Sequence, residues 1–398
     1  MRVVHLATGF VSAIPHGARG PEKTIYFLTK YLAHLSCEID VIDIKSGACS
    51  RGETRARFQE LWDPPLSGSN IFSYFLKVII FTLQLFPVLR HLVKNGKADI
   101  IHAHSQFPAA AVLLAKKLFG WKIPLVYTAH NPYLLMPSSL ANKLKHLLIE
   151  DKVLRRVDRV VAQTEAVGQE LSLKFKIEPT RIRQVYAGID IEAINSFIKL
   201  HPHKVSSTKI VFYPAVINPR KNQAAIIEGI PQVLKACPDC RFIFAGAIDD
   251  RAYFNTIQKS VFDHGLSPWV EFTGELSTEP LYKLYRDVTV FVFPTHYESQ
   301  GVVLLEAMAF GLPVIASRIG PVLDVVSLEK ASALLIDPDN TEEIAEAIIK
   351  LLGDESLRNK ISAKGRKLAS SRFSWSQTAQ GMLAMYEELI ESSSIDEK

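Results

Sequence analysis

The chain has 398 residues, of which 48% are hydrophobic and 22% are charged, a composition typical of a soluble globular protein. This length favours two domains over a single core. Four cysteines are too few for a disulfide-stabilised secreted domain and suit a reducing compartment, so we expect a cytoplasmic protein. No basic run is interleaved with aromatic residues, which argues against nucleic acid as a partner.

The first half of the chain alternates short apolar runs with amphipathic helical stretches. Its N-terminal run is too short, and too broken by His5 and Thr8, for a signal peptide, and we interpret it as a first strand. Residues Ser46 to Asn70 are expected to form a loop-like insertion. The predicted strands of this half are residues 2–7, 38–44, 98–104, 123–130 and 157–164.

Ile71 to Leu89 is the most hydrophobic segment, and its length approaches the roughly 20 apolar residues of a transmembrane helix. Three polar residues fall on one helical face, namely Ser73, Lys77 and Gln84. Pro87 is expected to end the helix. These features favour a core helix that covers the first sheet, while an interfacial surface helix and a membrane span remain open.

A polar, turn-rich stretch from about Asn195 to Thr208 precedes a second series of predicted strands, at residues 209–215, 240–247, 269–274, 288–295, 312–317 and 332–337. Strands that alternate with helices predict parallel sheets covered on both faces. We therefore expect an α/β protein with two Rossmann-like domains facing across a cleft, residues 1–195 and residues 209–373. Residues 374–398 would form a last helix and a polar tail, and this helix either completes the second domain or crosses back to the first.

The segment HYESQGVVLLEAMAFGLPVIAS holds two glutamates, Glu298 and Glu306, with seven residues between them. A helix is predicted to begin near Gly301, so the amides of Gly301, Val302 and Val303 would form an anion site at its N-terminus. Glu306 would point back toward this end and suit the diol of a ribose, while Glu298 would suit the hydroxyls of a sugar. The spacing alone equally fits one glutamate favoured by the helix dipole and another on a solvated face.

This segment resembles the E-x7-E signature of family 4 of the retaining, GT-B-fold nucleotide-sugar glycosyltransferases, also called glycosyl transferases group 1. Other stretches similar to that family are IPHGARGPEKTIYFLTKYLA, ADIIHAH, VYTAHNP, RIRQVYAGID, NPRKNQAAIIEGI and FSWSQTAQGMLAMYEEL. The resemblance covers essentially the whole chain. It implies a GT-B fold whose first domain binds the acceptor and whose second domain binds the nucleotide-sugar donor.

The resemblance assigns Lys221 to the diphosphate of the donor, where a fixed cation would stabilise the charge of the leaving group. The family usually also has an arginine at the position of Val216, which this chain lacks. Arg220 is a candidate substitute, although adjacent side chains rarely aim at one point. Asn222 stands where the family usually has a glycine.

On the first domain, the resemblance places His130 near the transferred sugar, as a catalytic residue together with Lys221 and Glu298. His104 is a weaker candidate on the acceptor side, and His102 is expected to be structural. No third ligand at a suitable spacing accompanies these two histidines, so we expect no metal ion and no cofactor. Gly20, in the turn before the first helix, would bring the backbone close to the donor.

The predicted function is transfer of a sugar from a nucleotide-sugar to a glycan or lipid-linked acceptor, with retention of anomeric configuration and without a metal ion. Two alternatives stay open. A GT-B-fold sugar-nucleotide epimerase would share the donor site but use no acceptor, and a non-catalytic sugar-nucleotide-binding subunit would bind without turnover.

The net charge of +5 is uneven, because residues 1–200 carry 26 Lys and Arg against 16 Asp and Glu. Basic residues flank the apolar helix and continue in a leucine-striped stretch: Arg90, His91, Lys94, Lys143, Lys145, Lys152, Arg155 and Arg156. This pattern predicts peripheral binding of the N-terminal domain to anionic lipid on the cytoplasmic face of a membrane. The alternative is a core helix beside an ordinary solvated basic helix.

Overall fold

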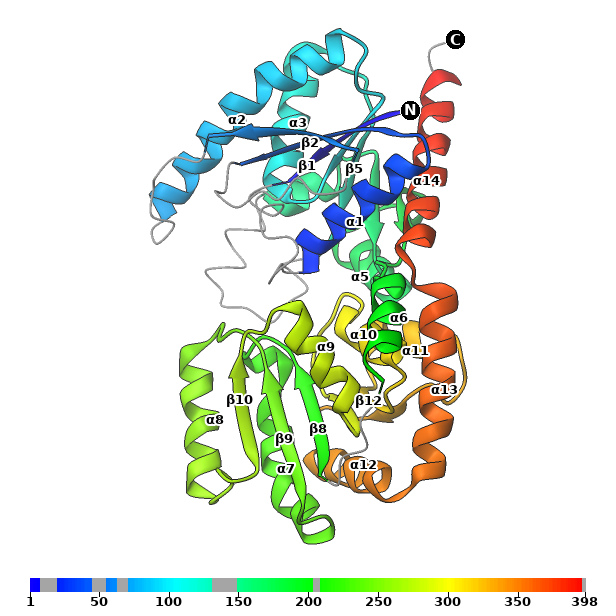
Figure 1. Cartoon of the computed structure of the whole chain (residues 1–398). Coiled ribbons are helices and arrows are strands. Elements are labelled where there is room, and N and C mark those ends of the chain that lie inside the picture. The colour runs from blue at the N-terminus through cyan, green and yellow to red at the C-terminus, as the bar shows by residue number, and fades with distance from the viewer. Residues whose placement is uncertain (8–19, 45–54, 63–70, 131–148, 203–207, 396–398) are drawn as a thin grey trace. The chain divides into compact units, whose positions relative to one another are not determined.

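The structure is a computed structural model that describes residues 1–7, 20–44, 55–62, 71–130, 149–202 and 208–395 (Figure 1). The chain divides into two compact units, Met1–Ala187 with Trp375–Lys398, and Gly188–Ser374. Each unit is built on one parallel sheet, so the predicted α/β class with two Rossmann-like domains is confirmed. Helix α6 (Ile191–Leu200) belongs to the second unit and occupies the first part of the stretch that was expected to be turn-rich.

The sheet of unit 1 has the strand order β3-β2-β1-β4-β5-β6-β7, with every pair parallel. Its strands are β1 (Arg2–Leu6), β2 (Glu38–Ile44), β3 (Arg57–Leu61), β4 (Ile100–Ala103), β5 (Leu125–Thr128), β6 (Arg159–Ala162) and β7 (Ile182–Gln184). Strand β3 lies inside the segment that was expected to be a loop. It is held at the sheet edge by Arg57, which contacts Asp40 at 2.8 Å and Glu38 at 3.3 Å.

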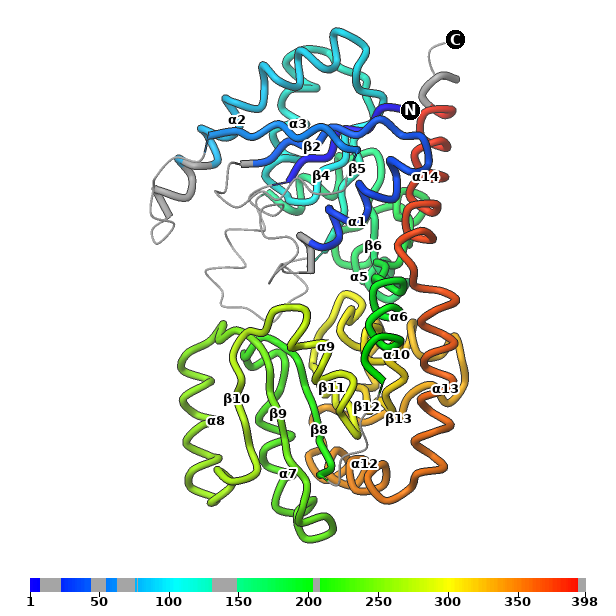
Figure 2. Tube along the Cα trace, viewed as in Figure 1, coloured from blue at the N-terminus to red at the C-terminus, as the bar shows by residue number. Residues whose placement is uncertain are grey.

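The helices of unit 1 are α1 (Gly20–His34), α2 (Ile71–Lys94), α3 (Gln106–Phe119), α5 (Glu165–Phe175) and α14 (Trp375–Ile395). The last helix, α14, packs against α1 beside the first sheet (Figure 2). The rings of Phe27 and Trp375 stack with centroids 5.3 Å apart, and Met382, Met385 and Tyr386 join the core of this unit. The C-terminal helix therefore crosses back to the N-terminal unit.

Helix α2 continues past Pro87 to Lys94, contrary to the expectation that the proline would end it. A proline inside a helix leaves one carbonyl unbonded, four residues before it. Here that residue is Leu83, which is exposed, so water can satisfy the carbonyl. Along the opposite face Phe81, Leu85, Leu89 and Leu92 are buried. Within the described residues, no helix has both the length and the apolar character needed to span a membrane.

The sheet of unit 2 has the order β10-β9-β8-β11-β12-β13 and is also parallel. Its strands are β8 (Lys209–Pro214), β9 (Cys240–Ala245), β10 (Val270–Gly274), β11 (Val290–Phe293), β12 (Val314–Ser317) and β13 (Leu334–Ile336). Its further helices are α7 (Gln223–Ala236), α8 (Arg251–Asp263), α9 (Thr278–Asp287), α10 (Val302–Phe310), α11 (Gly320–Val326), α12 (Thr341–Gly353) and α13 (Glu355–Arg372).

In both units the strand order reverses direction between two neighbouring strands, β1 and β4 in unit 1 and β8 and β11 in unit 2. Open parallel sheets bind ligands beyond the carboxyl ends of the strands at such a reversal, because the two connecting loops diverge there. The candidate residues of unit 2 follow β8 and β11, and those of unit 1 follow β4 and the neighbouring strand β5.

Candidate functional site

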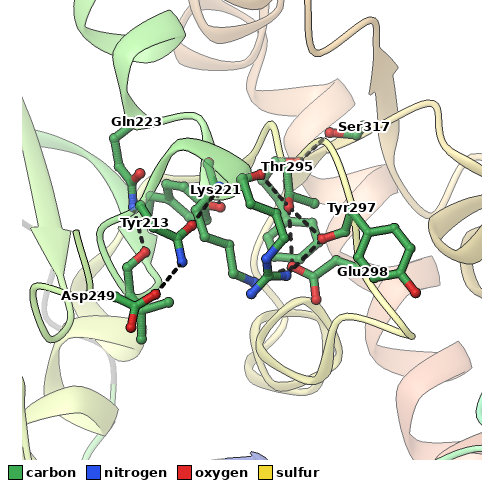
Figure 3. Close-up of polar contacts among 12 residues, drawn as sticks. Tyr213, Lys221, Gln223, Asp249, Thr295, Tyr297, Glu298 and Ser317 are labelled. Carbon is green, nitrogen blue, oxygen red and sulfur yellow. Dashed lines mark hydrogen bonds and ion pairs between the residues drawn. The ribbon is translucent and has the colours of Figure 1, made fainter. Parts of the chain in front are cut away.

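The reversal point of unit 2 brings together the loops after β8 and β11 (Figure 3). Lys221 belongs to a short 3-10 turn, Pro219–Lys221, after β8, and Glu298 lies in the loop after β11. The two loops are joined through the backbone, since the amide of His296 donates to the carbonyl of Arg220 at 2.9 Å. This bond fixes how the basic turn faces the acidic loop.

The basic turn is shaped by two asparagines. The side chain of Asn218 accepts a hydrogen bond of 3.1 Å from the amide of Lys221 and so caps the turn. Asn222 has a φ of +57°, a left-handed conformation that glycine adopts freely and that asparagine tolerates better than most residues. Its side-chain amide also donates to the carbonyl of Pro338 at 2.7 Å, which ties the turn to the loop after β13.

Two cations of this turn converge on Glu298. Lys221 forms an ion pair with the Glu298 carboxylate, and both side chains are buried, with 10% of the surface of each exposed. The guanidinium of Arg220 lies 3.8 Å from the same oxygen, Oε1, and donates to the carbonyl of Tyr297 at 2.9 Å. The expectation that adjacent side chains would not aim at one point is therefore wrong for Arg220 and Lys221.

The environment of Lys221 makes it a strong partner for an anion. Burial lowers the pKa of its ammonium group, while the Glu298 carboxylate opposes that shift. A buried ammonium has lost much of its hydration, so removing its counter-charge costs several kcal/mol unless another anion replaces it. Arg220 and Lys221 together carry one positive charge more than Glu298 neutralises, so the turn suits a further negatively charged ligand.

Helix α10 begins directly after Gly301, as the sequence predicted. Gly301 has a φ of +87°, and a Cβ atom there would lie 3.1 Å from the ring of Phe293 on β11. Only glycine fits this position without a shift. Since helix geometry leaves the first amides without partners inside the helix, Val302 and Val303 direct N–H groups toward the carboxyl edge of the sheet.

Glu306 lies one turn further along α10 and is buried. The hydroxyl of Tyr285 on α9 donates to its Oε2 atom at 3.3 Å. Burial, and secondarily the charge of Glu306, raise the pKa of Tyr285, so this phenol remains a hydrogen-bond donor. The sequence did not identify Tyr285 as a partner, because the two residues are on different helices.

In unit 1, the carboxyl ends of β1, β4 and β5 carry four buried histidines: His5, His102, His104 and His130. Nδ1 of His5 lies 2.9 Å from Nε2 of His104, and Nδ1 of His104 lies 3.1 Å from Nε2 of His130. His102 instead contacts Tyr386 of α14 at 2.5 Å and Thr128 at 2.7 Å. The structure thus brings the predicted His104 and His130 together.

Sequence reasoning missed His5 in this group. The ligand atoms of His5, His102 and His104 all lie within 4.8 Å of one another, so the argument that no third histidine accompanies the pair was wrong. The signal was a histidine inside the first predicted strand, at the point where β1 pairs with β4. That no metal ion takes part remains a prediction.

Gly20 begins α1, as expected for a residue between the first strand and the first helix. The rest of the turn that was expected to approach the donor, residues 8–19, lies outside the described residues. The role predicted for Gly20 therefore stays a prediction.

Comparison with known proteins identifies the family of this chain. The model of the family "Glycosyl transferases group 1" matches residues 197–368, and that of "Glycosyltransferase Family 4" matches residues 18–193. A D-inositol 3-phosphate glycosyltransferase from Jonesia denitrificans is 25% identical over 90% of this chain and 85% of its own length. Another protein of the same name, from Corynebacterium glutamicum, is 26% identical over 75% of this chain and 74% of its own.

Among solved structures, sucrose-phosphate synthase from Thermosynechococcus elongatus superposes with a TM-score of 0.79 and 22% identity, over 98% of this chain and 100% of its own. HepE from Anabaena, in complex with UDP and glucose, gives a TM-score of 0.74 and 20% identity, over 97% and 99% of the two chains. These likenesses concern the fold. They match both sheets, and none of them favours an epimerase or a non-catalytic subunit. The chain belongs to the GT-B glycosyltransferases of the family 4 type and is an enzyme of the hexosyl-transferring class.

Proposed function

We propose that unit 2 binds a nucleotide-sugar donor, and that the enzyme transfers its sugar to a glycan or lipid-linked acceptor with retention of anomeric configuration. The observation that carries this proposal is the convergence of Lys221 and Arg220 on one buried carboxylate beside the start of α10. Solved structures of similar fold contain UDP or UDP-glucose, which supports a nucleoside diphosphate as the ligand of this edge.

In this proposal the diphosphate lies at the N-terminus of α10. The amides of Val302 and Val303 and the ammonium of Lys221 bind its oxygens, while Glu306 accepts hydrogen bonds from the ribose hydroxyls. Arg220 supplies the positive charge that related enzymes obtain from an arginine at the position of Val216. The two cations stabilise the negative charge that develops on the leaving diphosphate as the glycosidic bond breaks.

The same contacts support a mechanism in which the diphosphate leaves, and the acceptor attacks, on the same face of the sugar. A covalent route needs a carboxylate free to act as a nucleophile, whereas Oε1 of Glu298 is engaged by Lys221 and Arg220. Glu298 is instead proposed to hold hydroxyls of the sugar and to position the lysine. His130 of unit 1 is proposed to assist the transferred sugar as a hydrogen-bonding group.

The test is a panel of UDP-, GDP- and ADP-sugars, ranked by thermal shift and then measured by calorimetry. Lys221→Ala should weaken binding of the best donor by tenfold or more, because a hydrogen bond to a charged group contributes about 1.5–3 kcal/mol. Lys209 is the matched control: it lies at the amino end of β8 and donates to the carbonyl of Leu352. Equal losses for Lys209→Ala and Lys221→Ala would contradict the assigned site.

Three further substitutions test the phosphate contacts separately from the ribose contacts. Val216→Arg should restore part of the affinity lost in Arg220→Ala, and a silent Arg220→Ala would show that one cation and the helix amides suffice. Glu306→Gln should weaken ribonucleotide donors but leave 2′,3′-dideoxy donors unchanged. Equal affinity of the wild type for the two kinds of donor would remove the ribose assignment.

We also propose that unit 1 binds anionic lipid, through neighbouring faces of α2 and α3. Leu83 on α2 and Leu118 on α3 are 65% and 61% exposed, which is unusual for leucines on helices that cover a sheet. Beside them is a hollow of about 490 Å³, lined by Phe86, Pro87, Arg90, His91, Lys94, Asn95 and Phe119. Among the described residues, no carboxylate pairs with Arg90 or Lys94, so both are available to lipid phosphates.

Flotation with liposomes tests this surface. Wild-type protein should float with phosphatidylglycerol vesicles at low salt, less at high salt, and not with phosphatidylcholine alone. Arg90→Glu with Lys94→Glu should abolish flotation, whereas the equal charge change Lys350→Glu with Lys360→Glu on unit 2 should not. Equal effects of the two double variants would refute the assigned surface and leave the donor site unaffected. Lys143 and Lys145 lie outside the described residues.

A further inference from the structure

Three histidines of unit 1 form a row of hydrogen-bonded rings. They come from β1, from the end of β4 and from the end of β5, so that neighbouring strands place them side by side. The row runs from His5 through His104 to His130, with N···N distances of 2.9 and 3.1 Å. The rings also stack, with centroids 5.2 and 5.3 Å apart. Such regular spacing indicates one connected unit.

All three rings are buried, and burial lowers their pKa values, so each is neutral near pH 7. His102 stacks on His104 at 4.2 Å but stays outside the row, because its two nitrogens contact Tyr386 and Thr128. A neutral imidazole has one N–H group and one acceptor nitrogen. Consequently the row has only two proton arrangements, one with N–H on every Nδ1 and one with N–H on every Nε2.

The inner end of the row distinguishes these arrangements. Nε2 of His5 is buried and has no hydrogen-bond partner among the residues that the structure describes. The second arrangement would put an N–H group there, and buried N–H groups without an acceptor are rarer than buried acceptors without a donor. The first arrangement leaves only a lone pair at that position and is therefore favoured.

We propose that His5 and His104 are positioning residues that fix His130 in its Nδ1–H form, so that His130 presents a hydrogen-bond donor at the carboxyl edge of the sheet. A donor there suits a sugar oxygen or a phosphate oxygen, whereas the opposite tautomer would present a lone pair to it. This inference rests on the role proposed for His130 in sugar transfer. Free histidine in water prefers the Nε2–H form, so a row of Nδ1–H rings requires enforcement by the protein.

The direct test is a long-range ¹H–¹⁵N spectrum of the full chain labelled with ¹⁵N-histidine, near pH 7. Protonated and unprotonated ring nitrogens resonate far apart, so the spectrum assigns each tautomer without any activity assay. We expect the Nδ1–H form for His5, His104 and His130. A charged ring, or an Nε2–H form at His104 or His130, would overturn the proposal.

Variants of His5 test its effect on the reaction. His5→Phe keeps an aromatic ring but removes the donor to His104, so the His130 signals should shift toward a mixture of tautomers. The kcat should fall roughly tenfold, while KM for the donor should stay unchanged. A roughly tenfold loss is the lower end of the range seen when a residue that orients a functional histidine is replaced. His5→Asn, whose amide nitrogen can occupy the place of Nδ1, should recover most of the rate.

Unchanged His130 signals in His5→Phe would refute the positioning role. If the wild type transferred no sugar to any acceptor, the proposed function would fail instead. The tautomers would still be decided by the spectra, so the two failures are distinguishable.

Discussion

Acid should destabilise unit 1 through its buried histidines. Burial lowers the pKa of His5 from 6.5 to about 3 and that of His130 from 6.5 to about 4. For a base whose folded-state pKa is depressed, the stabilisation is fully present above the unfolded pKa. It is lost as the pH falls from 6.5 toward the folded values, because the unfolded chain binds protons that the folded chain rejects.

The size of the effect follows from these values. At pH 5 each ring binds nearly one more proton in the unfolded chain than in the folded chain. Below pH 6.5, each such proton lowers the free energy of unfolding by about 1.4 kcal/mol per pH unit. His5 and His130 therefore cost about 2 kcal/mol each at pH 5, or about 4 kcal/mol together. His102 and His104 shift in the same direction and add to this loss. Whole domains are stable by about 5–15 kcal/mol, so unit 1 should be close to unfolding.

Tryptophan fluorescence during urea unfolding can measure this unit selectively. Trp62, Trp121 and Trp375 belong to unit 1, and Trp269 belongs to unit 2. In a Trp269→Phe background the signal comes from unit 1 alone. His5→Phe in this background removes one of the titrating rings, so it should reduce the loss between pH 7.5 and pH 5 by about 2 kcal/mol.

Two results would refute this reasoning. The first is a loss below about 1 kcal/mol in the Trp269→Phe background, which would mean that the rings are charged in the folded state or solvated. The second is an identical loss with and without His5, which would assign the acid sensitivity to other groups.

Three more substitutions test the packing of the two units. Glu298→Gln should destabilise unit 2 by about 3–5 kcal/mol in urea unfolding, because Lys221 keeps its buried charge without a counter-charge; a neutral result would mean that water reaches the lysine. Gly301→Ala should cost about 1–3 kcal/mol through its left-handed backbone and the ring beside it, whereas Gly353→Ala, which meets no atom within 4 Å, should cost less than 1 kcal/mol. Tyr386→Phe should lower the stability of unit 1 by about 1–3 kcal/mol, since a buried ring nitrogen on β4 loses its partner; calorimetry without a shift in Tm would contradict that hydrogen bond.

Most of the buried strands were predictable because they are short, largely apolar runs bounded by polar turns. Strand β3 was not, because an edge strand buries little and most of its residues are exposed. Its attachment depends on Arg57, whose acidic partners are on the neighbouring strand β2. The course of α2 past Pro87 was missed for a related reason, since sequence alone does not show that Leu83, four residues before the proline, is exposed.

For the site, the sequence predicted which residues follow the strands at the reversal point but not which of them touch. Glycine at the start of α10 follows from local geometry, so it was predictable. The pairing of Glu298 with Lys221 joins two loops that are separated in sequence by three strands and three helices. The inclusion of His5 depends on strand register, which a single sequence does not specify.

The two reversal points differ in charge, and this difference affects how strongly each unit attracts a negatively charged donor. At unit 1 the described groups are neutral imidazoles, which can direct a hydrogen bond but attract a distant anion only weakly. At unit 2 two cations face a single glutamate, so positive charge is in excess there and attracts a diphosphate. We therefore expect initial capture of a nucleotide-sugar by unit 2. The neutral donor groups proposed for unit 1 would attract the phosphates less strongly than Lys221 and Arg220 do.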